Sequence, residues 1–378
     1  MEHVIEKFAL DNALRYKGKT KPGAVLGSVI QELPEAKKDI KELKKLAHKI
    51  CKEVNKMSLE EQELRLMEIA PELLEEEEKE EVQQDIFAGF EVPKHTKVIT
   101  AFPPEPSKYP HIGHAKSIII NNEFAKRHKG KFILRFEDTN PELAQDEFYK
   151  IHLENYEWLG IKPDKIQYAS DFMDKFYELA EKLIKSSDAY VCSCAQADVK
   201  KARMKGMECV HRQQSTEDNI AAWESMKKDA QGCILRAKID LKHKNAVMRD
   251  PALFRVIEAK HCRQGNQYRA WPTYDFQTSV MDGLEKVTHR FRTKEFEQRS
   301  ELQKYLQEKL SLPITSTYEF ARFNMEGVES SGRIIREKVE NNELMGWDDP
   351  SLTTLVALKR RGFQPEAIKH FSLITGIP

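Results

Sequence analysis

Two histidines close a proline-rich segment, PPEPSKYPHIGH, at residues 103–114. His111 and His114 are three residues apart, so in a helix their side chains lie on one face. Pro110 suits an early position of a helix that begins near His111. The free N–H groups of a helix start attract phosphate, and Gly113 lets a ligand approach the backbone closely. Two histidines alone at a helix start are often structural, but the whole segment is more specific and predicts a phosphate site.

A second group of residues has the chemistry of a metal site. Cys192 and Cys194 form one close pair, Cys209 and His211 form another, and residues 195–208 separate the two pairs. Three sulfur ligands and one imidazole suit a tetrahedral Zn2+ site. With all four ligands used, no coordination position stays open for catalysis, so the metal would be structural. The alternative is a set of reduced cysteines without metal.

The predicted phosphate site needs a strand before it and a helix after it, and both are indicated. Residues 97–102 form a β-branched run typical of a buried strand, and a helical pattern extends from residue 111 to about 128. A strand at 131–136 follows, and then helices at 143–159 and 171–185. Alternating strands and helices indicate an α/β fold with a doubly wound sheet.

Two regions depart from this alternation. Residues 1–92 have helical composition and period, which predicts an N-terminal helical domain, with a dedicated partner-docking module as the alternative. The acidic run at 75–81 is interpreted as a solvated helix face or a linker. Residues 188–262 contain the cysteine pairs and a strand at 232–240, and they are interpreted as an α+β insertion.

The insertion divides the predicted sheet into two halves, at residues 93–187 and 263–317. We expect the sheet to resume around 272–276 and 283–289. Residues 318–378 are expected to form short strands and helices.

The composition excludes several classes of protein. With 61 Lys and Arg against 61 Asp and Glu, the formal net charge is zero, so nucleic-acid binding would need local basic patches. No apolar run is long enough to span a membrane, and the first residues lack a signal-peptide core. We therefore expect a soluble, cytoplasmic protein with no membrane partner.

The segment 103–114 resembles the HIGH signature of class I aminoacyl-tRNA synthetases, in the version of archaeal and eukaryotic glutamyl- and glutaminyl-tRNA synthetases. RFEDTNP at 135–141 is similar to the second motif of this family. The likeness continues through TYDF at 273–276, RTKEF at 292–296 and GWDDP at 346–350, and it covers most of the chain. The chain is therefore identified as similar to archaeal-type glutamyl-tRNA synthetases.

The resemblance implies a class I Rossmann-type nucleotide-binding fold with an insertion that binds the tRNA acceptor end, an N-terminal helical domain and a C-terminal stem-contact segment. It implies ATP with Mg2+, glutamate and tRNA as substrates. Glutamate would attack the α-phosphate of ATP, giving glutamyl-adenylate and pyrophosphate, and the acyl group would then move to the terminal ribose of tRNA. Such a reaction needs positioning and charge stabilisation and no side-chain nucleophile.

The same resemblance assigns roles to individual residues. His111 and His114 should contact the triphosphate. Glu137 should hold the substrate ammonium, Tyr274 should shape the amino-acid pocket, and Arg292 should meet a substrate carboxylate with its planar donor fork. The remaining nucleotide-binding set is Pro104, Glu105, Gly113, Arg322, Phe323, Ser331 and Arg333. The alternative is core packing for Tyr274 and Phe323, and a surface ion pair for Arg292. Related synthetases carry a similar zinc knuckle in the acceptor-binding insertion.

The sequence departs from the family pattern at two charged positions. Ala101 stands where the family has an arginine that faces the amino acid, so recognition of the glutamate carboxylate would depend on Arg292 or on an unidentified cation. Loss of a charge-assisted hydrogen bond costs roughly 1.5–3 kcal/mol. Gly332 stands where the second nucleotide signature has a lysine that touches the phosphates, and Arg333 and Arg336 are near enough in sequence to replace it.

The chain also ends at Pro378, whereas full-size relatives continue into β-barrel domains that read the anticodon. The expectation is a chain without that domain: a shortened protein, one half of a split enzyme, or a short paralogue. A basic cluster at 359–361 and 369–370 is expected to contact tRNA phosphates. The leading hypothesis is a glutamate–tRNA ligase. The rivals are an enzyme that transfers activated glutamate to a tRNA base and a catalytically impaired tRNA-binding paralogue.

Overall fold

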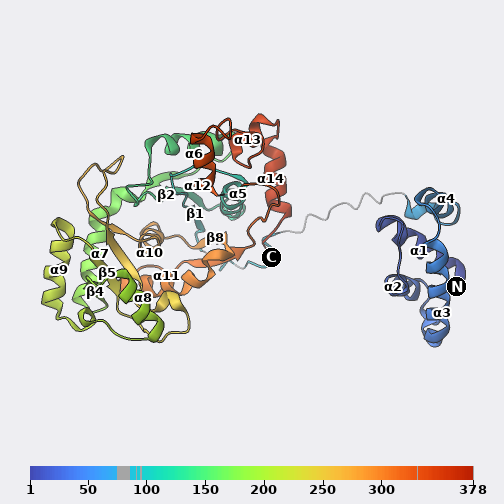
Figure 1. Cartoon of the computed structure of the whole chain (residues 1–378), viewed down its shortest axis with the longest axis horizontal. Coiled ribbons are helices and arrows are strands. Elements are labelled where there is room, and N and C mark those ends of the chain that lie inside the picture. Colours follow the sequence, from blue (N-terminus) through green and yellow to red (C-terminus); the bar gives the residue numbers. More distant parts are fainter. Residues whose placement is uncertain (75–85, 91, 94–95, 330, 378) are drawn as a thin grey trace. The chain divides into compact units, whose positions relative to one another are not determined.

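The structure, a computed structural model, describes residues 1–74, 86–90, 92–93, 96–329 and 331–377. The chain divides into two compact units, Met1–Gln84 and Asp85–Pro378, and each is described by itself (Figure 1). The acidic run at 75–81 lies outside the described residues.

The first unit is helical, as the sequence predicts. Its α-helices are α1 (Glu2–Arg15), α2 (Pro22–Glu32), α3 (Ile40–Val54) and α4 (Leu59–Ile69), and its short 3-10 helices are η1 (Pro34–Asp39) and η2 (Pro71–Leu73). The helix α4 begins with a capping box in which Ser58 and Glu61 each bond the other's backbone N–H. Apolar side chains of all four helices, among them Leu10, Val29, Leu43 and Leu66, form a separate core.

The second unit is built on a parallel sheet of five strands in the order β3-β2-β1-β8-β9. The strands are β1 (Ile99–Phe102), β2 (Lys131–Phe136), β3 (Lys165–Tyr168), β8 (His289–Thr293) and β9 (Ser316–Phe320). The helices α5 (Ile112–Arg127) and α6 (Asp146–Trp158) follow β1 and β2, which confirms the predicted alternation. Apolar residues of both helices, such as Ile119 and Tyr156, pack with Phe132 and Leu134 of β2.

A second sheet, antiparallel and of four strands, separates β3 from β8 in the sequence; it begins at Ala189 and ends at Pro272, beyond the insertion predicted at 188–262. Its order is β4-β5-β6-β7, with β4 (Ala189–Cys192), β5 (Ile234–Ala237), β6 (Ala252–Val256) and β7 (Ala270–Pro272). Around it lie η3 (Ala169–Phe172), α7 (Met173–Lys185), α8 (Gln196–Lys205), η4 (Val210–Gln213), α9 (Thr216–Lys228) and η5 (Ala246–Met248). Its core includes Trp223, Phe254 and Trp271, all without exposed surface.

The prediction that the central sheet resumes at 272–276 and 283–289 is wrong for most of these residues. Pro272 ends β7 of the second sheet, and Tyr274–Glu285 form the helix α10. The buried Phe276 and Val280 are four residues apart, which is helical spacing. The central sheet resumes only at His289, where β8 begins.

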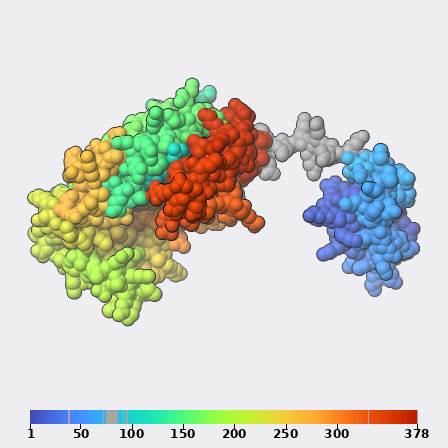
Figure 2. Space-filling view, turned by 45° about the horizontal axis from the view of Figure 1, so that its top comes forward, coloured from blue at the N-terminus to red at the C-terminus, as the bar shows by residue number. Residues whose placement is uncertain are grey.

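The C-terminal elements are η6 (Lys294–Phe296), α11 (Glu297–Leu310), α12 (Gly332–Glu340), α13 (Leu355–Arg360) and α14 (Pro365–Ile374). They lie in two places: α11 packs against α10, whereas the segment around Thr353 and Leu355 and the helix α14 pack against α5. The N–H of Ile112 donates to the carbonyl of Thr353 at 3.0 Å, and the N–H of Leu355 donates to the carbonyl of Pro110 at 2.8 Å. Figure 2 shows this segment, in red, packed against the green surface of the same unit. Among the described residues, no helix is long and apolar enough to cross a membrane.

Candidate active site

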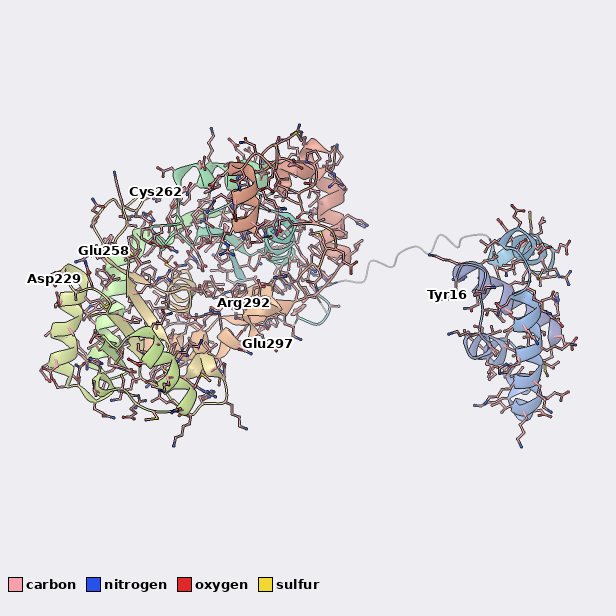
Figure 3. The ribbon with its side chains drawn as sticks, viewed as in Figure 1. Tyr16, Asp229, Glu258, Cys262, Arg292 and Glu297 are labelled. Atoms are coloured by element: carbon pink, nitrogen blue, oxygen red, sulfur yellow. The ribbon has the colours of Figure 1, made fainter. Side chains whose placement is uncertain are left out.

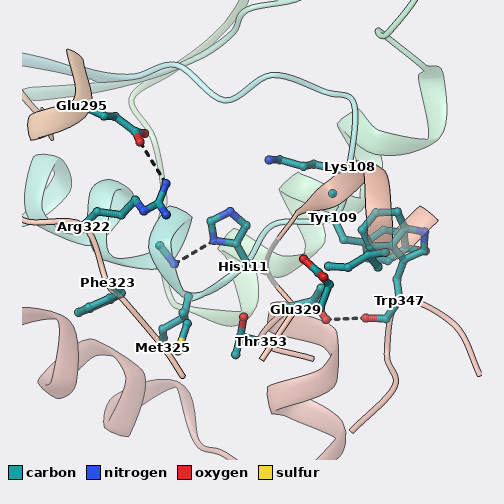
Figure 4. Close-up of a pocket in the computed structure, with 15 residues that line it drawn as sticks. Lys108, Tyr109, His111, Glu295, Arg322, Phe323, Met325, Glu329, Trp347 and Thr353 are labelled. Atoms are coloured by element: carbon teal, nitrogen blue, oxygen red, sulfur yellow. Dashed lines mark hydrogen bonds and ion pairs between the residues drawn. The ribbon is translucent and has the colours of Figure 1, made fainter. Parts of the chain in front are cut away.

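A cleft opens where β1, β2 and β8 end, and it has two lobes. The inner lobe lies toward the sheet, and its wall includes His114, Glu137, Tyr274, Arg290 and Arg292. The outer lobe lies between the starts of α5 and α12, and its wall includes Tyr109, Phe323, Glu329, Gly332 and Trp347 (Figure 4). Both lobes are lined by Lys108, His111, Gly113, Glu295 and Arg322, so they form one continuous site.

The two histidines lie side by side at the start of α5. His111 is the N-cap residue, and its Nδ1 accepts from the N–H of Gly113 at 3.1 Å. The Nδ1 of His114 accepts from the N–H of His111 at 3.1 Å, and the ring centroids are 4.0 Å apart. Pro110 therefore precedes the helix and does not occupy its first turn. A Cβ on Gly113 would come within 2.9 Å of His111 Cε1, so this glycine is needed for the close approach of the ring.

The charge state of these rings follows from their surroundings. Burial lowers the pKa of His111 to about 3, with nearby Lys108 acting in the same direction. Burial also lowers the pKa of His114 well below its ordinary value. Both rings are neutral at pH 7, and because each Nδ1 accepts a hydrogen bond, each Nε2 carries the proton. The pair therefore presents two N–H donors to the cleft without a full positive charge.

A network of buried charges lies behind the inner lobe. Arg135 has no exposed surface, and its guanidinium contacts Asp282 at 2.9 Å and Glu285 at 2.5 Å. The second oxygen of Asp282 pairs with Arg290. Gln303 Oε1 accepts from Arg290 at 2.9 Å and from Arg292 at 2.8 Å. The two cleft arginines are therefore held in position before any ligand binds.

The three residues predicted to bind the amino acid all line the inner lobe. Glu137 Oε1 accepts from Thr278 Oγ1 at 2.7 Å, and burial raises the pKa of this carboxyl although Arg135 opposes the shift. Tyr274 begins α10, and its ring packs on Phe296 with centroids 5.3 Å apart.

Arg292 lies at the end of β8 in the interior of the unit (Figure 3). It donates to Ser300 Oγ at 2.6 Å and approaches Glu319 at 3.7 Å. Only 7% of its surface is exposed, which does not fit the alternative of a surface ion pair. The three residues are brought together, and their roles stay predictions.

Arg290 is a cleft residue that the sequence analysis missed. Thr100 of β1 pairs with His289 of β8, so the next positions along the two parallel strands are Ala101 and Arg290. Arg290 is 3% exposed, and its Nε has no hydrogen-bond partner among the described residues. Burial lowers the pKa of Arg290 to about 9, so the side chain still carries its charge at neutral pH. No local pattern in the sequence indicated Arg290, because only the pairing of β1 with β8 places this cation beside Ala101.

Three of the seven predicted nucleotide residues, Gly113, Arg322 and Phe323, line the outer lobe. Arg322 is exposed and pairs with Glu295 at 3.4 Å, and Phe323 stacks on Phe371 with centroids 5.2 Å apart. Ser331 is the N-cap of α12 and Gly332 is its first residue. Arg333 is exposed and is absent from the described wall of either lobe. Pro104 and Glu105 lie in the wall of the inner lobe instead.

The predicted metal ligands form one compact cluster. One ligand atom from each of Cys192, Cys194, Cys209 and His211 lies within 4.8 Å of every other. Cys194 Sγ is 3.3 Å from His211 Nδ1, while Ser193 Oγ is 2.9 Å from His211 Nε2. Nδ1 is therefore the ring atom that faces the sulfurs, and the serine can hold the opposite nitrogen. Burial and the neighbouring sulfurs raise the pKa of Cys194 to about 12, and a divalent cation would counter this by stabilising thiolates.

The basic cluster near the C-terminus is partly engaged in contacts within the chain. Arg360 pairs with Asp348 at 3.0 Å, and Lys369 pairs with Glu123 at 3.0 Å. Lys359 lies over the ring of Trp158. Lys359 and Arg360 line a hollow together with Trp347.

Comparisons with known proteins agree with this geometry. Residues 97–377 match the family model of class I tRNA synthetases (E and Q), catalytic domain. Glutamate–tRNA ligases of Pyrococcus furiosus and Nitrosopumilus maritimus are each 40% identical over all of this chain, which spans 67% and 66% of their lengths. The enzyme of Methanobrevibacter smithii is 36% identical over all of this chain and 67% of its own length.

Solved structures share the fold at lower identity. The glutamate–tRNA synthetase of Elizabethkingia anophelis has a TM-score of 0.52 at 19% identity, covering 74% of this chain and 61% of its own. A glutamate–tRNA ligase of Elizabethkingia meningosepticum, solved in complex with its amino acid, has a TM-score of 0.50 at 19% identity, covering 65% of this chain and 53% of its own.

Proposed function

The chain belongs to the family of class I tRNA synthetases for E and Q, and from this membership we propose that it attaches glutamate to tRNA in an ATP-dependent reaction through a glutamyl-adenylate. The observation that carries the proposal is the continuous two-lobed cleft, in which an amino-acid pocket and a phosphate site share five wall residues. The archaeal origin of the relatives supports assignment to the archaeal-type branch, and we expect the protein in the cytoplasm.

The phosphate end of the reaction needs donors where charge develops. The N–H groups of Ile112 and Gly113 already donate to Thr353 and His111, so the predicted free donors of the helix start are engaged within the chain. The Nε2–H groups of His111 and His114 can meet the α-phosphate of ATP, which enters as its Mg2+ complex. Because the rings are already fixed by bonds to the backbone, little reorganisation accompanies the reaction. Both rings are neutral and carry a proton on Nε2, so they can donate to the phosphate oxygens as negative charge develops there.

The amino-acid end must recognise an ammonium and two carboxylates. Glu137 can accept from the ammonium, and Tyr274 can close the pocket over the side chain. Arg290 and Arg292 offer two guanidinium groups within the same lobe, and each has a buried Nε without a partner among the described residues. We assign to Arg290 the cationic role that Ala101 cannot fill.

The cysteine cluster fits a structural zinc ion, held by Cys192, Cys194, Cys209 and His211. Metal analysis of protein expressed in zinc-replete medium should find zinc bound to the wild type and lost from a Cys194→Ser/Cys209→Ser variant. Cys51 lies in the core of the first unit, so Cys51→Ala serves as the control and should keep the metal. Wild-type protein without zinc would contradict the assignment.

ATP–pyrophosphate exchange, measured with and without glutamate and tRNA and followed by aminoacylation of tRNA, tests the proposed function. Exchange that requires glutamate, together with charging of the tRNA terminus, supports the ligase. Exchange without charging of the terminus favours transfer to another acceptor, and tRNA binding without exchange identifies an impaired paralogue.

The variant His114→Ala should reduce exchange at least about a hundredfold, because it removes a donor from the phosphate site. His48→Ala, on the exposed face of α3, should exchange at the wild-type rate. Full activity of His114→Ala would refute the phosphate site.

A further inference from the structure

Lys108 is an unassigned cation in the wall shared by both lobes. Its side chain is half-buried, and its Nζ has no hydrogen bond or ion pair among the described residues. Figure 4 shows the amine pointing to the side of the cleft where His111 and Arg322 lie. An unpaired lysine among neutral imidazoles and an arginine is suited to an anionic ligand.

The backbone around Lys108 is held from three sides. The carbonyl of Lys108 can only accept, so His152 Nε2 donates to it, at 2.9 Å, and His152 Nδ1 accepts from the hydroxyl of Tyr156. Arg336 of α12 donates to the neighbouring carbonyl of Ser107 at 2.6 Å. Tyr109 stacks on Trp347 with ring centroids 5.2 Å apart. The loop is fixed while the lysine side chain stays available.

The path of this side chain crosses the first residue of α12. A Cβ built on Gly332 would lie 2.7 Å from Lys108 Cδ, which is closer than carbon atoms tolerate. Position 332 and the Lys108 side chain therefore compete for one space. Gly332 is also the position where the nucleotide signature that this segment resembles carries a lysine.

We propose that Lys108 binds the polyphosphate chain of ATP in the place that a lysine at position 332 would otherwise occupy. The absence of a side chain at Gly332 leaves the space that the Lys108 side chain fills. This assignment rests on the proposed function of the cleft. Arg336 is engaged with Ser107 and Arg333 is exposed away from the cleft wall, so neither is positioned as Lys108 is. The positive charge that the reaction requires is retained, but it comes from the loop that contains Lys108 instead of from position 332.

The test uses the full chain and initial rates of ATP–pyrophosphate exchange. Lys108→Met keeps the aliphatic chain over Gly332 and removes the charge. We expect its kcat/KM for ATP to fall about tenfold to a hundredfold, as for loss of one charge-assisted hydrogen bond, with KM for glutamate within twofold of wild type. Lys162→Met removes an exposed lysine from another loop and should change neither parameter.

A reciprocal variant tests the shared space. Lys108→Ala/Gly332→Lys should recover most of the activity lost in Lys108→Ala, because the truncation frees the volume for a lysine from position 332. Unchanged ATP kinetics in Lys108→Met, an equal rise in both KM values, or no recovery in the double variant would each overturn the proposal. Melting temperatures within a few degrees of wild type exclude unfolding as the cause.

Calorimetric titration with ATP separates this inference from the proposed function. If the wild type binds ATP without exchange, the proposed function fails, and weaker binding by Lys108→Met still supports the lysine. If the wild type exchanges and Lys108→Met binds ATP as tightly as wild type, the lysine assignment fails alone.

Discussion

The two lobes of the cleft differ in how their charged side chains are held. At and behind the inner lobe, Arg135, Asp282 and Arg290 are nearly or fully buried, and Asp282 pairs with both arginines. In the wall that the outer lobe shares with the inner one, Arg322 and Glu295 are exposed and form a single contact of 3.4 Å, and Lys108 has no partner among the described residues. The proposed amino-acid lobe is therefore fixed before binding, whereas the proposed phosphate lobe keeps its cations available for the ligand.

This contrast has an energetic reason. A buried charge needs a permanent partner, because otherwise nothing offsets the free energy of its desolvation. A pocket whose side chains are fixed in this way can discriminate one amino acid from another. A triphosphate carries its own charge and its own metal, so cations that meet it can remain solvated until it arrives. Selectivity is expected from the inner lobe and electrostatic attraction from the outer lobe.

The largest expected effect comes from breaking the inner network. Asp282→Ala leaves Arg135 and Arg290 without their shared partner, and we expect the free energy of unfolding to fall by about 3–5 kcal/mol. Glu295→Ala removes an exposed partner of Arg322 and should cost at most about 1 kcal/mol. Urea unfolding measures both. Equal losses in the two variants would contradict the contrast between the lobes.

A second prediction concerns His152, which holds the Lys108 loop. Burial lowers the pKa of His152 to about 4, so the native state binds fewer protons than the unfolded state between that pH and the ordinary value near 6.5. Stability should therefore be constant above pH 6.5 with respect to this group. It should fall by about 1.4 kcal/mol per unit as the pH drops toward 4.

The variant His152→Gln isolates this contribution. The amide can donate to the Lys108 carbonyl and accept from Tyr156, but it does not titrate. Below pH 6.5 its unfolding free energy should depend less steeply on pH than that of wild type. His111 and His114 keep their own slope in both proteins, and the raised pKa of Glu137 opposes it in both.

Tryptophan fluorescence reports this transition, since all four tryptophans lie in the second unit. Identical slopes in the two proteins would show that His152 is not held neutral.

Local patterns in the sequence predicted the elements that carry the chemistry. The strand at 131–136 and the helix that begins beside His111 follow from residue preference, proline placement and periodicity. The cysteine cluster follows from spacing alone, because both pairs of ligands are short-range. The helix at Tyr274–Glu285 was missed because β-forming Tyr and Phe near its start outweighed the helical spacing of its buried residues.

The two unassigned cations could not be found by local reasoning. Arg290 enters the inner lobe because β8 pairs with β1, far away in sequence, and that pairing is a property of the fold. Lys108 reaches its position because His152 and Arg336 fix the loop, and because Gly332 leaves the space open. In both places the sequence showed that a charge was absent, and only the tertiary structure shows which side chain stands nearby.

The smallest expected effects separate the lobes by substrate. Arg290→Lys keeps the charge opposite Asp282 but loses the planar donor fork, and we expect KM for glutamate to rise about tenfold with KM for ATP within twofold. Arg322→Ala removes an exposed cation of the outer lobe and should raise KM for ATP by a few fold without affecting glutamate. Exchange kinetics with each substrate varied in turn measure both. A rise of both KM values in Arg290→Lys would mean that this arginine supports the fold of the cleft and not the recognition of the amino acid, because a direct contact acts on one substrate only.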